Sequence, residues 1–306
     1  MSRLRPAREG SVLAVVGGKG APGASEIAAS FAALVARDWP VLLVECDGDG
    51  GQLALRLGAD PREGSLLGPA RALSANEPNL ESLLPRWLVG GEAGWPAVLL
   101  GLPDPVADLA ESNIAGLTGR LLELLAASFP LVVCDVGHRL RCGTHVDEAV
   151  RLHRELLTDA DAVLLVIGSR QEQLHAGFGQ LDTLINELGI GPDRLRVVVN
   201  GQGCAGAVPS AEASRAIGAE LAKHGLAVDA YIPWDQKALR SSVRLGVPLA
   251  VARHRSSYAR ALGRLIEEVL LPSLPQPAAR KQRLRPPVAV AKASAMAEEV
   301  ALPWRR

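Results

Sequence analysis

A glycine-rich turn between an apolar run and a helical pattern constrains the fold of this chain more than any other feature. The turn is Gly18-Lys19-Gly20-Ala21-Pro22-Gly23-Ala24-Ser25. The run before it, Ser11–Val16, is typical of a buried strand, and Ser25–Phe31 begins a helix. In such a strand–turn–helix unit, backbone N–H groups converge on one point where an anion can bind. The sequence therefore predicts a phosphate-binding loop.

The spacing of this loop matches the pattern G-x-x-x-x-G-K-[ST], except that Ala24 stands where the pattern has lysine. That lysine normally bridges the β- and γ-phosphates, where negative charge builds up during phosphoryl transfer. Pro22 also removes one N–H donor, and Ala21 leaves the backbone less free to wrap a phosphate. We therefore expect weakened phosphate binding and slow or absent hydrolysis.

Apolar runs alternate with helical patterns along most of the chain. The expected strands are Val12–Val16, Val41–Glu45, Ala97–Gly101, Leu131–Asp135, Ala162–Ile167, Leu195–Asn200 and Ala227–Ile232. The expected helices are Ala24–Arg37, Ile114–Ser128, Gln173–Leu188, Ala211–His224, Gln236–Leu245 and Ser257–Leu270. Near-continuous apolar strands between helices are typical of a parallel sheet covered on both faces. The predicted fold class is therefore α/β, a doubly wound, mostly parallel sheet in a three-layer α/β/α arrangement.

The two ends of the chain differ from its middle. Residues 1–10 form a basic arm that we expect to be flexible, residues 11–270 the domain, and residues 271–306 a Pro- and Arg-rich tail that we expect to be disordered. The end of the tail is rich in alanine, so it offers little apolar area to a membrane. We therefore expect a solvated tail rather than a membrane anchor.

The charge balance and the cysteines indicate in which cellular compartment the protein works and which partners it does not bind. Lys plus Arg and Asp plus Glu both number 33, so no overall field draws the chain to nucleic acid, and DNA is not indicated as a partner. The four cysteines lie far apart, which is typical of reduced thiols in a cytoplasm. Two of them, Cys46 and Cys134, are expected to be buried apolar fillers. We expect a cytoplasmic protein, at most peripheral at the inner face of the membrane.

Carboxylates follow two of the expected strands. Asp47 comes after the strand that begins at Val41, and Asp135 ends the strand that begins at Leu131. Because the carboxyl ends of parallel strands meet at one edge of the sheet, these side chains should lie near the glycine loop. Together with the Ser25 hydroxyl they could hold Mg²⁺ directly or through water. The sequence therefore predicts a nucleoside triphosphate site, with ATP and Mg²⁺ as the cofactors.

With these segments the chain resembles the MinD/ParA family of P-loop ATPases. The family's loop reads GKGGVGKT, and its early lysine corresponds to Lys19. Three later segments add to the likeness, which runs in order from about Ser11 to Leu270: Arg196–Asn200, Tyr231–Asp235 and Arg244–Leu249. The strand end Leu100–Pro105 also resembles the CpaE/TadZ group of pilus-assembly and pole-localising proteins, several of which have altered loops.

The resemblance implies a role for each matching residue. The phosphate cradle would be Gly18, Lys19, Gly20, Ala21, Gly23, Ala24 and Ser25, and the adenine side would include Asn200 and Pro233. Asp47 would orient the attacking water, Asp135 would hold metal-bound water, and Lys19 would reach the partner's nucleotide across a homodimer. The implied function is a nucleotide-gated dimer that positions a protein cargo in pilus assembly, septum placement or partitioning.

Other readings of the sequence remain open. The chain could be a scaffold that kept the fold and binds no nucleotide. The loop also fits G-x-G-x-x-G, and Glu45 follows about 20 residues later, as in an NAD-binding oxidoreductase where that carboxylate holds a ribose hydroxyl. A zinc site at His138, Cys142 and His145 lacks a fourth ligand.

The remaining histidines and a cluster of arginines are expected at the surface. The histidines are His153, His175, His224 and His254, and the arginines are Arg139, Arg141, Arg151 and Arg154. We expect the arginines to form a solvated face beside acidic neighbours rather than a nucleic-acid patch. Nothing in the order of Ser, His and Asp residues indicates a hydrolase triad.

Overall fold

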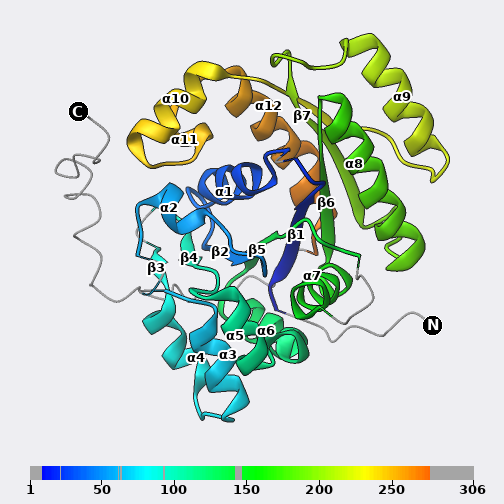
Figure 1. Ribbon diagram of the computed structural model, residues 1–306. Coiled ribbons are helices and arrows are strands. Elements are labelled where there is room, and N and C mark those ends of the chain that lie inside the picture. Colours follow the sequence, from blue (N-terminus) through cyan, green and yellow to red (C-terminus); the bar gives the residue numbers. More distant parts are fainter. Residues whose placement is uncertain are drawn as a thin grey trace.

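The computed structural model describes residues 9–20, 22–60, 62, 64–91, 94–141 and 147–275, and in them a central sheet runs through the molecule (Figure 1). The strands are β1 Ser11–Gly17, β2 Val41–Cys46, β3 Val89–Gly90, β4 Ala97–Leu99, β5 Leu131–Val136, β6 Ala162–Gly168, β7 Leu195–Gln202 and β8 Ala230–Pro233. Their order is β3-β4-β2-β5-β1-β6-β7-β8. Every described pair is parallel except the short pair β3–β4. The predicted α/β class is confirmed.

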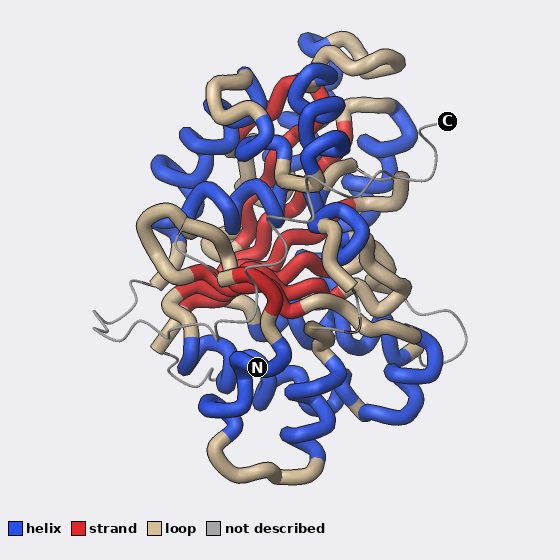
Figure 2. The backbone as a smooth tube through the Cα atoms, turned by 90° about the vertical axis from the view of Figure 1, so that its left-hand side faces the viewer, coloured by secondary structure: helices blue, strands red, loops and turns tan. Residues whose placement is uncertain are grey.

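Helices cover both faces of this sheet, which Figure 2 shows as a layer of strands between two layers of helices. One face carries α1 Ala24–Val35, α2 Leu53–Leu57, α10 Gln236–Leu245, α11 Leu249–Ala252, α12 Ser257–Leu265 and the π-helical turn η3 Ile266–Leu270. The other carries α3 Leu67–Ser74, α4 Leu80–Leu83, the 3₁₀ turn η1 Leu84–Trp87, α5 Pro105–Ser112, α6 Ile114–Ser128, α7 Glu148–Asp159, α8 Gln171–Asp182, the π-helical turn η2 Thr183–Glu187 and α9 Ser210–Ala222.

Alternate residues of the central strands enter two separate cores. Along β1, Val12 and Val16 pack with the layer of α6 and α8, whereas Leu13 and Val15 pack with the layer of α1 and α12. All four side chains have no exposed surface. This burial on both faces explains why the strand is apolar throughout rather than alternating in polarity.

Two helices have the bounds that the sequence predicts, and several others were not predicted. The helices α6 and α10 begin and end at the expected residues, whereas β3, α2 to α5 and α7 were missed. The start of α7 did carry a local signal, because the Asp147 carboxylate accepts hydrogen bonds from the N–H groups of Ala149 and Val150. An N-terminal aspartate of this kind is a common helix start.

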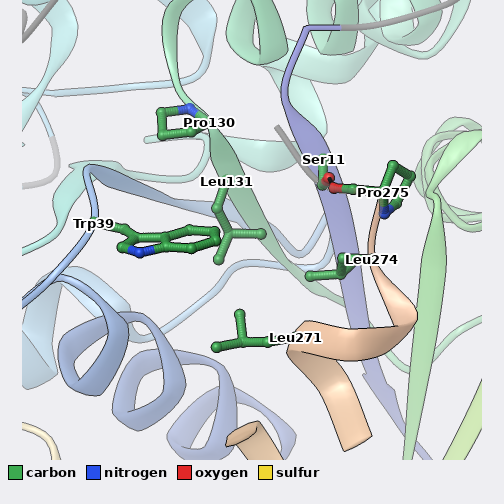
Figure 3. A pocket seen from close by; sticks show the side chains of 7 residues that line it. All are labelled: Ser11, Trp39, Pro130, Leu131, Leu271, Leu274 and Pro275. Carbon is green, nitrogen blue, oxygen red and sulfur yellow. Dashed lines mark hydrogen bonds between the residues drawn. The ribbon is translucent and has the colours of Figure 1, made fainter. Parts of the chain in front are cut away.

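The packed domain extends past residue 270, where we expected the tail to begin. A short helix, α13 Leu271–Ser273, continues the chain, and Leu274 is buried. The Ser11 hydroxyl donates to the Pro275 carbonyl over 2.5 Å. Figure 3 shows the small apolar hollow at this place, lined by Ser11, Trp39, Pro130, Leu131, Leu271, Leu274 and Pro275. The chain thus reaches Pro275 beside the first residue of β1, at the opposite end of that strand from the glycine loop.

The expected arm and tail fall largely outside the described residues, at 1–8 and 276–306. Within the part of the chain that the structure describes, every helix is too short or too polar to cross a membrane.

Candidate nucleotide site

The glycine loop joins the central strand β1 to α1, and two of its glycines have a left-handed backbone. Gly20 has φ +98° and Gly23 has φ +91°, in a backbone region that residues with a Cβ rarely adopt. Gly23 is the N-cap of α1 and makes no side-chain cap bond, so the first-turn N–H groups remain available to an anion. Among the predicted cradle residues, Ala21 alone lies outside the described part of the chain.

Small side chains fit where the loop closes on itself. A Cβ added at Gly17 would lie 2.6 Å from Cγ of Pro22, so the proline ring requires a glycine there. Pro22 is buried, whereas Ala24 is only half-buried. Lys19 is exposed in the same loop. The loop therefore presents one exposed cation, and a methyl group at the position of the missing lysine.

Asp135 lies at the end of β5, directly beside β1, and its carboxyl group is buried. Burial raises its pKa to about 7, and the nearby negative charges of Glu45 and Asp47 add to the rise, while the Ser25 hydroxyl offsets part of it. The fold thus brings together Ser25 from α1 and Asp135 from β5, two predicted metal ligands. A buried carboxylate beside a hydroxyl is a donor set that Mg²⁺ can use.

Asp47 follows β2 and lies over the end of β5. A Cβ added at Gly137 would lie 2.4 Å from Asp47 Oδ1, so the two loops are in close contact. The same oxygen accepts the N–H of Asp49 over 3.0 Å. All three predicted metal ligands, Ser25, Asp47 and Asp135, therefore gather at one edge of the sheet.

Glu45, which would bind the ribose if the chain were an NAD-binding oxidoreductase, instead binds backbone groups of the protein. It is buried, and its two carboxylate oxygens accept the N–H of Leu53 over 2.6 Å and that of Gly101 over 2.9 Å. Burial raises the pKa of this carboxyl. In dinucleotide-binding folds the strand after the glycine loop lies directly beside the first one. Here β5 lies between β1 and β2, so both contacts and topology contradict that alternative.

The prediction that His153 lies at the surface is wrong. Its side chain on α7 has no exposed surface. Its Nε2 accepts the N–H of Gly48 over 2.9 Å, and its Nδ1 lies 2.9 Å from the Arg139 carbonyl oxygen. These partners require a neutral ring that carries its proton on Nδ1, and burial lowers the pKa accordingly. His153 therefore joins the loop after β2 to the loop after β5.

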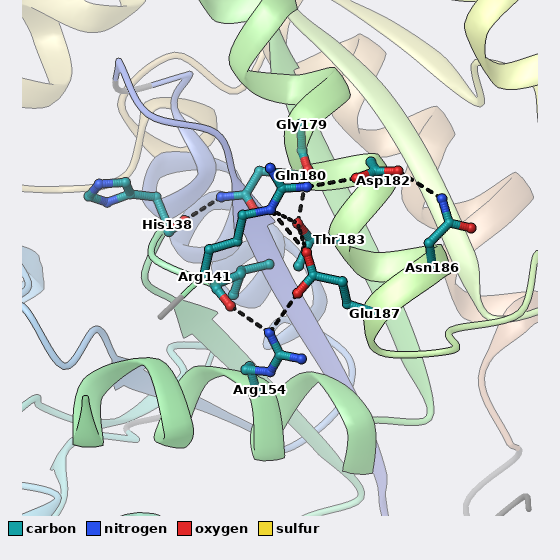
Figure 4. A network of polar contacts seen from close by, with 10 residues as sticks. His138, Arg141, Arg154, Gly179, Gln180, Asp182, Thr183, Asn186 and Glu187 are labelled. Atoms are coloured by element: carbon teal, nitrogen blue, oxygen red, sulfur yellow. Dashed lines mark hydrogen bonds and ion pairs between the residues drawn. The ribbon is translucent and has the colours of Figure 1, made fainter. Parts of the chain in front are cut away.

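The arginine cluster is neutralised by acidic partners, as expected. Arg139 pairs with Asp49 and Asp147, and Arg151 lies 3.6 Å from Glu148. Figure 4 shows the other two: Arg141 contacts Asp182 over 2.6 Å and Glu187 over 3.0 Å, and Arg154 contacts Glu187 over 3.0 Å. The Arg141 pairs dock the loop after β5, and the Arg154 pair docks α7, onto the end of α8 and the π-helical turn that follows it.

Asn200 and Pro233 lie farther along the same edge, at the ends of β7 and β8. The Asn200 amide donates to the Pro22 carbonyl over 2.8 Å, so its nitrogen contacts the glycine loop itself. A Cβ at Gly23 would lie 2.5 Å from this nitrogen, which explains the glycine. An adenine contact by Asn200 or Pro233 stays a prediction.

The sequence made two predictions about cysteines, one on burial and one on zinc binding. Cys46 and Cys134 are buried in the core, as expected. Of the residues weighed for zinc, Cys142 and His145 lie outside the described residues. Among the residues described, no group of three or more potential metal-binding His, Cys, Asp or Glu side chains occurs.

A glycine loop after the first strand, with an aspartate at the end of the adjacent strand, defines the P-loop class of α/β fold. No protein-family profile and no curated protein sequence matches the chain. Among solved structures it is similar to a ParA family ATPase from Chlorobium tepidum TLS, with a TM-score of 0.68 and 19% identity over 85% of this chain and 99% of that one.

Two further structures agree. The septum site-determining protein MinD from Pyrococcus horikoshii OT3, solved with Mg-ADP, gives a TM-score of 0.62 and 19% identity over 85% of this chain and 95% of that one. An ATP complex of Cyanothece McdA(D38A) gives a TM-score of 0.61 and 14% identity over 91% of this chain and 100% of that one. At these identities the likeness establishes the fold, which is that of the MinD/ParA ATPases.

Proposed function

We propose that this chain binds ATP or ADP with Mg²⁺ at the glycine loop and acts as a nucleotide-gated dimer that positions a protein partner. The observation that carries the proposal is the meeting of Ser25 and the buried Asp135 at the base of a left-handed glycine loop. Free N–H groups of a helix start and a carboxylate for the metal are the two components that a triphosphate needs. The Mg-ADP and ATP complexes of proteins with this fold support the choice of ligand.

The Mg²⁺ ion would be held by Ser25 and, directly or through water, by Asp47 and Asp135. When bound, it would neutralise charge on the phosphate oxygens. Asp47 would orient a water toward the terminal phosphate. Ala24 supplies no charge at the β- and γ-phosphates, and a charge at about 4 Å is worth on the order of 1–4 kcal/mol in a partly shielded site. Binding is therefore weakened and hydrolysis is slow or absent.

Lys19 would supply the missing cation from the partner chain. It is exposed on the loop, and the resemblance to the MinD/ParA family suggests that it reaches the partner's nucleotide. The cellular role that fits is spatial positioning, in pilus assembly, polar localisation, septum placement or partitioning. The CpaE/TadZ group remains our proposed subgroup.

Lys19→Ala should abolish dimer formation in the presence of ATP and Mg²⁺, because each site loses its only cation from the loop. Multi-angle light scattering with ATP, with ADP and without nucleotide measures the effect. Lys237→Ala removes an exposed lysine on α10 and should leave dimerisation unchanged. Undiminished dimers of Lys19→Ala would contradict the role of this side chain.

A scaffold that binds no nucleotide is the second candidate, and one observation favours it. His153, Gln180 and Arg141 hold the loops around the site through contacts within the chain itself. A fold that is stable with these loops fixed could present a constant surface to a partner. Nucleotide titration separates the two candidates.

A further inference from the structure

Three side-chain amides donate to backbone carbonyls of the glycine loop and of Gly17, the last residue of β1 just before it. Gln180 Nε2 contacts the Gly17 oxygen over 3.4 Å, Gln173 Nε2 contacts the Gly20 oxygen over 2.7 Å, and Asn200 Nδ2 contacts the Pro22 oxygen over 2.8 Å. These residues come from α8 and β7, more than 150 positions away along the chain. The loop is therefore held along its length by groups outside the local strand–turn–helix unit.

The face of α8 is shaped for this contact. Gln173 and Gln180 are seven residues apart, about two helical turns, so they lie on one face. Between them are Ala176 and Gly177, and a Cβ added at Gly18 would lie 2.9 Å from the Ala176 carbonyl carbon. Small residues on both sides thus bring the helix and the loop close enough for the two amides to reach.

The geometry of the peptide bond gives these contacts a consequence for ligand binding. In a trans peptide the C=O of one residue and the N–H of the next point in opposite directions. When Gln180 holds the Gly17 carbonyl and Asn200 holds the Pro22 carbonyl, the N–H groups of Gly18 and Gly23 point away from those side chains. Such contacts fix the directions of these N–H dipoles before a ligand binds.

We propose that Gln173, Gln180 and Asn200 are positioning residues that pre-orient the loop for phosphate. The inference rests on the proposed function and deepens it. Since the loop lacks its lysine at Ala24, a larger share of phosphate binding falls on oriented N–H dipoles, whose value depends on their being fixed in advance. Gln180 also donates to the His138 carbonyl, so the same amide ties the loop to the segment after Asp135 (Figure 4).

The test uses Gln173→Met and Gln180→Met, singly and together, in the full chain. Methionine keeps the length of the side chain and adds no charge, but it cannot donate. Gln171→Met is the matched control, because Gln171 is exposed on the same helix. Asn200 is left unchanged because an adenine contact would complicate its effect. Two quantities are measured: amide hydrogen exchange of residues 17–25 without ligand, and calorimetric affinity for ADP and for inorganic tripolyphosphate.

The double variant should exchange faster in the loop while the rest of the sheet is unchanged. It should lose about tenfold in affinity for both probes, since two hydrogen bonds that orient the loop are gone. Equal losses identify the phosphate side of the ligand as the part affected. Unchanged loop exchange, or a loss for ADP without a loss for tripolyphosphate, would overturn the inference. If the wild-type chain binds neither probe, the proposed function itself fails, and the exchange measurement still decides whether the amides hold the loop.

Discussion

Asp135→Asn should make the ligand-free protein more stable at pH 8, by about 2–4 kcal/mol. The pKa of this buried carboxyl is raised from 3.8 to about 7 in the fold. The folded state therefore holds its proton at pH values where the unfolded chain has lost it, so stability falls as the pH rises from about 4 to 7. Above that range the full cost of a buried charge is present. Asparagine is neutral throughout and avoids this cost.

Urea unfolding at pH 5 and pH 8 measures the effect. The gain in the free energy of unfolding should be clearly larger at pH 8, because at pH 5 most Asp135 side chains in the folded protein are protonated. Asp38→Asn, at an exposed position in the turn after α1, is the control and should show no such difference between the two pH values. A variant less stable than wild type at pH 8 would show that the carboxylate is satisfied by contacts in the ligand-free fold.

The same substitution should remove the effect of Mg²⁺ on nucleotide affinity. An amide oxygen is a much poorer ligand for a divalent cation than a carboxylate, so ADP should bind Asp135→Asn equally well with Mg²⁺ and without it. Wild type should bind more tightly with the metal. A gain in stability with a loss of metal dependence indicates a residue retained for a ligand rather than for the fold.

Ala24→Lys should raise affinity for ATP at least fivefold and produce measurable phosphate release. The estimate follows from a charge at about 4 Å, worth on the order of 1–4 kcal/mol where solvent is partly excluded. Ala24 is half-buried, so a longer side chain has a way out of the loop. The new ammonium group would lie where charge builds up during transfer, so turnover should gain more than binding.

Ala24→Met is the matched control for this gain, because it adds length without charge. Calorimetry with ATP and a phosphate-release assay under saturating nucleotide give the two readouts. If the lysine and methionine variants behave alike, the missing charge is not what separates this chain from an active ATPase. The cause would then lie in Pro22 or in the contacts that hold the neighbouring loops.

Much of the fold could be predicted from the sequence because its strands are buried on both faces. Such strands are apolar throughout, and β1, β2, β5, β6 and β7 were recognised within two residues at each end. The short β3 and the helices α2 to α5, which have four to eight residues, were missed because so few turns show little periodicity. The longer α7, of twelve residues, was missed although Asp147 marks its start. Gly23, the N-cap of α1, was predicted as part of the loop because the loop motif is a short continuous stretch of sequence.

The convergence of Ser25, Asp47 and Asp135 could also be foreseen, since each lies next to the end of a parallel strand or the start of a helix. His153 and the two glutamines of α8 could not. The two glutamines contact backbone groups 42 to 163 residues away, and His153 contacts Gly48, 105 residues away, as well as Arg139, 14 residues away. On α7, His153 has the helical spacing of the buried Ala149, Val150, Leu156 and Leu157, so the pattern indicates its burial but not its partners. Only the packing of α7 and α8 against the site reveals their positions.

Titration calorimetry of the wild-type chain with ATP and with ADP, each with and without Mg²⁺, tests the central claim most directly. We expect a single nucleotide bound per chain, with the affinity for both nucleotides raised by the metal. A folded protein that gives no binding signal with millimolar ATP and Mg²⁺ would contradict the claim that the glycine loop still receives a triphosphate.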